Sequence, residues 1–75
     1  MIKELEAVFR EVFNNEKLVL TPETTNNDIN GWTSLTHAIL INSIERKFNV
    51  TFDIQEMLSM QTVTDIINRV SEKVK

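Results

Sequence analysis

The 75-residue sequence contains no cysteine, one glycine and one proline, and these scarcities exclude several kinds of protein. Without cysteine the chain cannot form disulfide bonds or thiolate metal sites, so any thiol chemistry must come from an added group. No apolar run is long enough to cross a membrane, so we expect no membrane span. The eight basic residues are scattered and form no stripe, so we do not expect nucleic-acid binding.

Length and charge describe a small and mildly acidic protein. We expect one domain over residues 1–75. Because a chain of this length buries only about 60% of its unfolded surface, it has little room for a deep catalytic centre. The net charge of −3 slightly favours basic partner surfaces. Charges begin at Lys3, which is too early for a secretion signal, so we expect a cytoplasmic protein. We also expect the protein to be a monomer.

Apolar residues recur every three or four positions in three segments, which is the pattern of amphipathic helices. They predict helices over about residues 2–14, over about residues 34–48 and from Thr62 toward the C-terminus. In the second helix, Leu35 is expected to flank the buried face. Asn14 and the asparagine after it provide a stop for the first helix.

Two capping signals complete the secondary structure. Asp53 and Glu56 have the spacing of a capping box and predict a brief helical turn through residue 58, and Thr62 and Asp65 repeat that spacing. The predicted fold class is therefore all-α. It is a small four-helix bundle with three longer helices, one short helix and a long loop between the first two helices.

The long connection over residues 15–33 is rich in turn formers but also contains apolar residues. Loops longer than about 12–15 residues are uncommon in compact domains unless they serve a function. We therefore expect this loop to pack along the bundle and to present the residues at its end. Its expected anchors are Leu18, Val19, Leu20, Ile29 and Trp32.

The pentapeptide Gly31–Leu35 places the hydroxyl of Ser34 where the loop becomes a helix. Such a hydroxyl can cap the helix, a role that Thr33 could also take, or it can carry a phosphate, because helix N-termini favour anions. Use of Ser34 as a hydrolytic nucleophile with His37 is a remote alternative, because no nucleophile-elbow motif is present. With one histidine and no cysteine, no metal site is expected.

Several motifs over nearly the whole chain resemble the acyl carrier proteins and the related peptidyl and aminoacyl carrier domains. The tract from Asp28 to Leu35 is similar to the family's modification motif. The downstream matches are Leu40, Ile44-Glu45, Phe48, Val50, Phe52 and Thr62-Val63. This resemblance implies that Ser34 carries covalent 4′-phosphopantetheine, added by a phosphopantetheinyl transferase, and that the thiol of this arm holds an acyl group as a thioester.

The resemblance also implies where partners and cargo would bind. Partners would dock on the second helix, and the residues expected to contribute are Thr33, Leu35, Ala38 and Ile39. An acyl chain would be sheltered by Leu40, Ile44, Met57 and Ile66.

The sequence departs from the family pattern in two places. Thr33 replaces the usual aspartate before the serine, which bears on the efficiency of modification. Glu45 is the only carboxylate of a helix that is typically acidic in the family, so electrostatic steering of partners should be weak.

The expected function is therefore a carrier, not an enzyme, that delivers acyl intermediates to acyl-transferring and synthase enzymes, as in fatty-acid or polyketide biosynthesis. An aminoacyl or peptidyl carrier and an unmodified helical interaction module are the alternatives. The sequence does not identify the cargo, the pathway or the partner enzymes.

Overall fold

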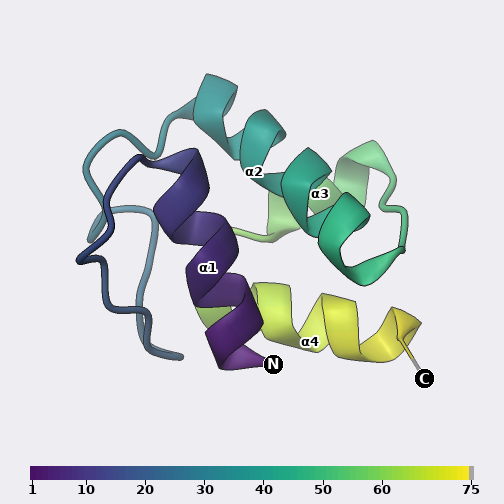
Figure 1. Ribbon diagram of the computed structural model, residues 1–75. Coiled ribbons are helices and arrows are strands. Elements are labelled where there is room, and N and C mark those ends of the chain that lie inside the picture. The colour runs from purple at the N-terminus through teal and green to yellow at the C-terminus, as the bar shows by residue number, and fades with distance from the viewer. Residues whose placement is uncertain (75) are drawn as a thin grey trace.

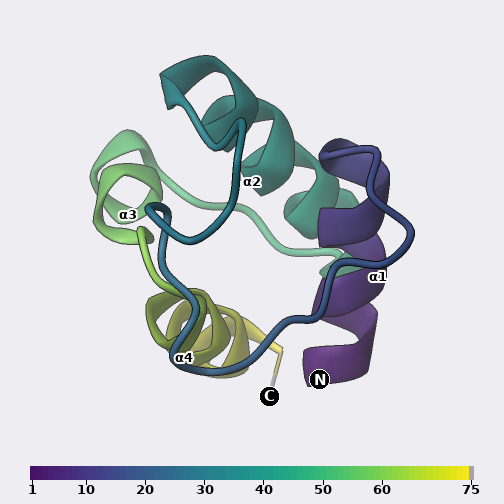
Figure 2. The ribbon, with the colours of Figure 1, turned by 90° about the vertical axis from the view of Figure 1, so that its left-hand side faces the viewer.

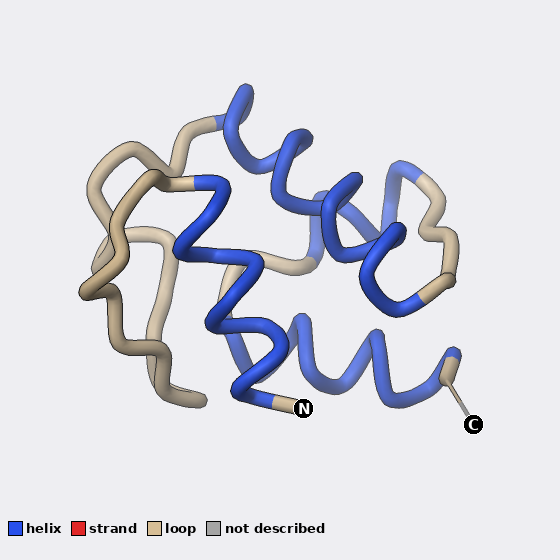
Figure 3. The backbone as a smooth tube through the Cα atoms, viewed as in Figure 1, coloured by secondary structure: helices blue, strands red, loops and turns tan. Residues whose placement is uncertain are grey.

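The computed structural model describes residues 1–74, which form four helices and no strand (Figure 1). They are α1 (Ile2–Val12), α2 (Ser34–Phe48), α3 (Ile54–Ser59) and α4 (Val63–Lys73). The predicted all-α fold is thus confirmed, with three longer helices, one short helix and a long loop between α1 and α2 (Figure 3).

The core forms where the apolar faces of α1, α2 and α4 meet. Each of these helices contributes side chains that are fully buried, and burial of one such side chain is worth roughly 1.5–3 kcal/mol. The fully buried residues of the three helices are Leu5, Phe9, Leu40, Ile41, Ile44, Val63, Ile66 and Val70. The helical spacing of apolar residues in the sequence therefore identifies the residues that form the core.

The helix ends follow the local sequence closely. Helix α2 has the predicted bounds, and the residue after its end, Asn49, has a left-handed φ of 56°. Helix α1 ends at Val12, two residues before the predicted end, because Asn14 also adopts a left-handed φ of 51°. At Thr62 only half of the predicted capping box is formed: its hydroxyl accepts a hydrogen bond from the Asp65 backbone N–H at 3.1 Å.

The loop between α1 and α2 passes α4 and α3 before it reaches α2 (Figure 2). Leu18, Leu20 and Trp32 are buried, as predicted, and Ile29 is half-buried. The prediction was wrong for Val19, which is 71% exposed. Its neighbours on either side turn inward, and the alternation of an extended segment directs Val19 to solvent.

Backbone hydrogen bonds tie the middle of this loop to the segment before α4. The Val63 N–H donates to the Thr24 carbonyl at 2.9 Å, and the Asn26 N–H donates to the Gln61 carbonyl at 3.1 Å. The Thr64 hydroxyl donates to the Pro22 carbonyl at 2.6 Å. These bonds bring a loop from the first half of the chain beside the link between α3 and α4.

Helix α3 is attached differently from the other helices, because none of its side chains is buried. The predicted capping box is complete: Asp53 accepts from the Glu56 N–H at 2.8 Å, and Glu56 accepts from the Asp53 N–H at 3.0 Å. Glu56 also forms ion pairs with Lys73 at 3.2 Å and with Arg69 at 4.0 Å. Polar contacts therefore connect α3 to α4.

Candidate functional site

The N-terminal end of α2 is capped by Thr33, not by Ser34. Thr33 has an extended backbone, and its hydroxyl accepts from the Thr36 N–H at 3.4 Å. In return, the Thr33 N–H donates to the Thr36 hydroxyl at 2.7 Å, and that hydroxyl donates to the Gly31 carbonyl. This reciprocal arrangement is a capping box, which leaves the Ser34 hydroxyl without a capping role.

Ser34 is exposed at the first residue of α2. The backbone N–H groups of the first turn and the helix dipole favour an anion at this position, and the first turn contains no acidic residue. The chain enters the helix through Gly31, whose φ of +88° would strain a residue with a side chain. The only glycine of the sequence therefore lies at the turn before Ser34, where the backbone requires it.

Trp32 fixes the loop immediately before the helix. Its ring packs edge-on against Phe9, with the centroids 5.3 Å apart, and lies 6.0 Å from Phe13. Such aromatic pairs add about 0.5–1.5 kcal/mol to the burial of their area. The predicted role of Trp32 as a packing anchor is confirmed.

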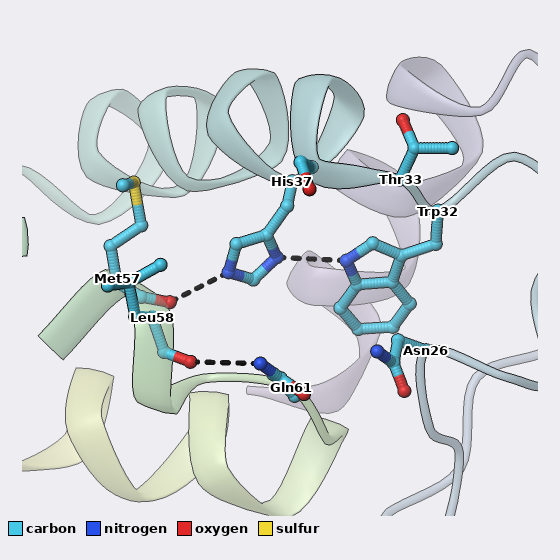
Figure 4. A pocket seen from close by; sticks show the side chains of 8 residues that line it. Asn26, Trp32, Thr33, His37, Met57, Leu58 and Gln61 are labelled. Carbon is cyan, nitrogen blue, oxygen red and sulfur yellow. Dashed lines mark hydrogen bonds between the residues drawn. The ribbon is translucent and has the colours of Figure 1, made fainter. Parts of the chain in front are cut away.

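His37 lies between Trp32 and α3 and uses both ring nitrogens (Figure 4). The Trp32 indole N–H donates to His37 Nδ1 at 2.9 Å, and His37 Nε2 lies 2.7 Å from the Met57 carbonyl oxygen. Neither nitrogen is left to accept a proton from Ser34. The geometry therefore gives no support to a Ser34–His37 hydrolytic pair.

A cavity of about 320 Å³ opens beside Ser34, between the loop, α2 and α3. Its walls combine apolar side chains with amide groups (Figure 4). The lining residues are Asn26, Trp32, Thr33, Ser34, His37, Met57, Leu58 and Gln61. The sequence contained no signal for Asn26, Leu58 and Gln61, because only the docking of the loop beside α3 brings them together.

The structure places the four expected cargo-lining residues in two environments. Leu40, Ile44 and Ile66 are fully buried in the core and do not line this cavity, whereas Met57 does. The periodicity of the three core residues is the periodicity of core packing. That these four residues shelter an acyl chain stays a prediction.

Large apolar side chains are exposed on the two helices that contribute to the cavity, and one of them, Leu58, lines it. On α2, Leu35 is 73% and Ile39 is 47% exposed, and on α3, Ile54 is 70% and Leu58 is 59% exposed. The prediction that Leu35 flanks the buried face was wrong, because the first turn of α2 extends past the core. Thr33 is also exposed, and Ala38 is half-buried.

Few negative charges lie on α2. Glu45 is half-buried and accepts from the Phe52 N–H at 2.8 Å, whereas Arg46 and Lys47 are exposed. On α3, the pKa of Glu56 lies below its ordinary value, chiefly because its carboxylate accepts from the Asp53 backbone N–H and also from Lys73. The carboxylate of Glu56 thus faces α4 and not the cavity, whose lining contains no acidic residue.

Two further findings concern residues 1–74. No group of three or more histidine, cysteine, aspartate or glutamate side chains is arranged to hold a metal ion. None of the helices is both long enough and apolar enough to traverse a bilayer.

Comparison with known proteins identifies the class. Residues 3–70 match the family model described as a phosphopantetheine attachment site. The structure is similar to the solution structure of a holo acyl carrier protein from Geobacter metallireducens, with 37% identity and a TM-score of 0.88. The similarity covers 97% of this chain and 84% of that chain. No significant match was found among curated proteins.

The fold and the family match define a carrier protein, which is not itself catalytic but serves as a substrate of other enzymes. Its prosthetic group is 4′-phosphopantetheine. The chain belongs to the acyl carrier protein family.

Proposed function

We propose that Ser34 is the attachment residue for 4′-phosphopantetheine and that residues 1–75 act as a single carrier domain. The observation that carries this proposal is the exposed Ser34 hydroxyl, which Thr33 releases from helix capping. A phosphodiester on Ser34 Oγ would meet the positive end of the α2 dipole. When bound, the group supplies a terminal thiol that holds cargo as a thioester.

The residues around Ser34 fit such an arm. The adjoining cavity offers the side-chain amides of Asn26 and Gln61 to polar groups, and the side chains of Met57 and Leu58 to apolar ones. Because the cavity opens beside Ser34, an arm attached there would reach these residues without any rearrangement of the core.

We propose an acyl group as the cargo, in fatty-acid or polyketide biosynthesis. The apolar part of the cavity wall and the likeness to a holo acyl carrier protein support this choice over an aminoacyl or peptidyl cargo. Loading assays with acyl-transferring and with aminoacyl-activating enzymes distinguish the two. Transfer of amino acids alone would overturn the acyl assignment.

The proposed partners are a phosphopantetheinyl transferase and the synthases or transferases that use the cargo. We propose docking through Thr33, Leu35, Ala38 and Ile39, because this stretch of α2 is adjacent to Ser34 and exposes two large apolar side chains. The scarcity of carboxylates on α2 supports contacts that are mainly apolar and only weakly dependent on salt. We also propose a cytoplasmic monomer, which light scattering and fractionation of the native host would test.

Intact-protein mass spectrometry tests the attachment residue. Wild-type protein is incubated with coenzyme A and a transferase of broad specificity, beside the variants Ser34→Ala and Ser71→Ala. We expect a mass increase of one phosphopantetheinyl group in wild type and Ser71→Ala, and none in Ser34→Ala with its helical content retained. Modification of Ser34→Ala would overturn the proposal.

An unmodified interaction module is the competing function, and Thr33 is the feature that favours it. The variant Thr33→Asp restores the residue usual in the family and keeps a good helix cap. We expect wild type to be modified, and we expect Thr33→Asp to be modified several-fold faster. Modification of Thr33→Asp alone, with none in wild type for several transferases, would favour the competing function.

A further inference from the structure

Three segments that are distant in sequence meet at the side chain of His37. It lies on α2, contacts the loop through Trp32 and contacts α3 through the Met57 carbonyl, at 2.9 and 2.7 Å. The two rings lie side by side and nearly parallel, with centroids 5.9 Å apart and an interplanar angle of 21° (Figure 4). One imidazole thus bridges two walls of the cavity beside Ser34.

The hydrogen-bond roles of this bridge follow from the chemistry of the indole. An indole nitrogen can only donate, so His37 Nδ1 must accept from Trp32. In the neutral ring the proton is then on Nε2, which donates to the Met57 carbonyl. Protonation of Nδ1 removes the acceptor and is incompatible with the bond from Trp32. The bridge therefore requires a neutral imidazole in one tautomer.

Helix α3 depends on this bridge more than other helices would. None of its side chains is buried: Met57 packs against the core but is only half-buried, and the fully buried Met60 follows the helix, so apolar packing holds α3 less firmly than α4. Besides the bond from His37, the Met57 carbonyl accepts only a long backbone bond of 3.3 Å, from the Met60 N–H. A second polar contact of α3 is formed by Glu56, which faces α4. His37 is thus the side chain of α2 that fastens α3 at the cavity.

We propose that Trp32 and His37 form a latch that positions α3 and holds the cavity beside Ser34 at its present width. Trp32 fixes the tautomer and orientation of His37, and His37 holds the Met57 end of α3. Opening of the latch lets α3 withdraw from α2 and widens the cavity. The latch thereby limits the size of the group carried on Ser34 that the cavity can take, a consequence that rests on the proposed function.

The cavity offers His37 no charged partner. Its other lining residues come from the loop, α2, α3 and the link to α4, and none of them has a charged side chain. The latch therefore depends on the two hydrogen bonds of the imidazole, to Trp32 and to the Met57 carbonyl.

Amide hydrogen exchange in the unmodified protein tests the latch directly. His37→Phe keeps a ring but removes both hydrogen bonds, whereas His37→Gln keeps one donor and one acceptor and does not titrate. We expect His37→Phe to accelerate exchange in α3 roughly two- to tenfold, the effect of losing one or two net hydrogen bonds, and to leave α4 unchanged. His37→Gln should exchange nearly as wild type does.

Fluorescence of Trp32, the only tryptophan, provides a second measurement. Because His37→Phe removes the acceptor for the indole N–H, the emission of Trp32 should shift in this variant, whereas His37→Gln should emit as wild type does. Unaltered α3 exchange in His37→Phe would overturn the latch. If His37→Phe does not fold, His37→Leu, which also lacks both hydrogen bonds, takes its place, and unaltered α3 exchange in that variant would overturn the latch.

The consequence for cargo is tested on protein that carries an octanoyl thioester. Cleavage of this thioester by hydroxylamine should be slower in His37→Phe than in wild type, because a wider cavity shelters more of the chain. Equal rates would overturn the limit on cargo size. A failure of Ser34 to accept the arm would be seen by mass and would leave the exchange measurements, made without the arm, unaffected.

Discussion

Helices α3 and α4 follow one another in the sequence but are held to the protein by different forces. Both begin at a side chain that caps the helix, Asp53 for α3 and Thr62 for α4. Helix α4 buries Val63, Ile66 and Val70, whereas α3 buries no side chain. Only Met57 of α3 packs partly against the core, so α3 depends more than α4 on a few directional polar contacts, each of which can be lost separately.

This difference has a consequence for the cavity. Local opening costs least where few apolar contacts are buried, so α3 should open at a lower free energy than α4. Because Met57 and Leu58 of α3 line the cavity, the wall most able to move is the one beside Ser34. The core, formed by α1, α2 and α4, can remain intact while this wall moves.

Truncation of a core residue in α4 should have the largest effect. We expect Ile66→Ala to lower the free energy of unfolding by about 2–5 kcal/mol, because Ile66 is fully buried and its loss leaves a cavity. The matched variant in α3, Ile54→Ala, should change it by about 0.5 kcal/mol or less, since Ile54 is 70% exposed. Urea unfolding followed by circular dichroism measures both. Equal losses would contradict the contrast between the two helices.

Removal of the two caps should have an intermediate effect and should separate local from global stability. Asp53→Ala and Thr62→Ala each remove a side-chain acceptor that is worth roughly 1 kcal/mol. We expect Thr62→Ala to lower the melting temperature by about 4–8 °C. Asp53→Ala should mainly accelerate amide exchange within α3, roughly fivefold, with a smaller change in melting temperature. Slower exchange in α3 than in α4 would show that α3 is not the weaker element.

The smallest effect is expected from the charge of Glu56, which links α3 to α4. Its folded-state pKa is lowered, so the stabilisation is complete above the unfolded-state pKa and is lost as the pH falls through the folded-state pKa. Wild type should therefore lose α3 protection upon acidification below about pH 4, the ordinary range of glutamate. Glu56→Gln should show a weaker acid dependence in α3 exchange measured over the same range. If the acid dependence of α3 exchange were the same in Glu56→Gln as in wild type, carboxylates other than Glu56 would be responsible for it.

The outcome of the sequence predictions depended on whether a feature was local. The bounds of α2, the capping box at Asp53 and the stop at Asn14 rest on contacts within a few residues and were confirmed. Leu40 and Ile44 lie in the core and not at the cavity beside Ser34, because periodicity identifies a buried face but not what lies opposite it. The role of Ser34 as an attachment residue stays a prediction.

The sequence by itself determined the helices, the residues that form the core and the exposed serine at a helix start, because these follow from hydrophobic periodicity and from capping over three or four residues. Only the tertiary structure decided that His37 joins Trp32 to Met57 and that Asn26 lies at the same cavity as α3. The physical reason is that these contacts join segments up to twenty or more residues apart. Their geometry exists only after the loop has docked on the core.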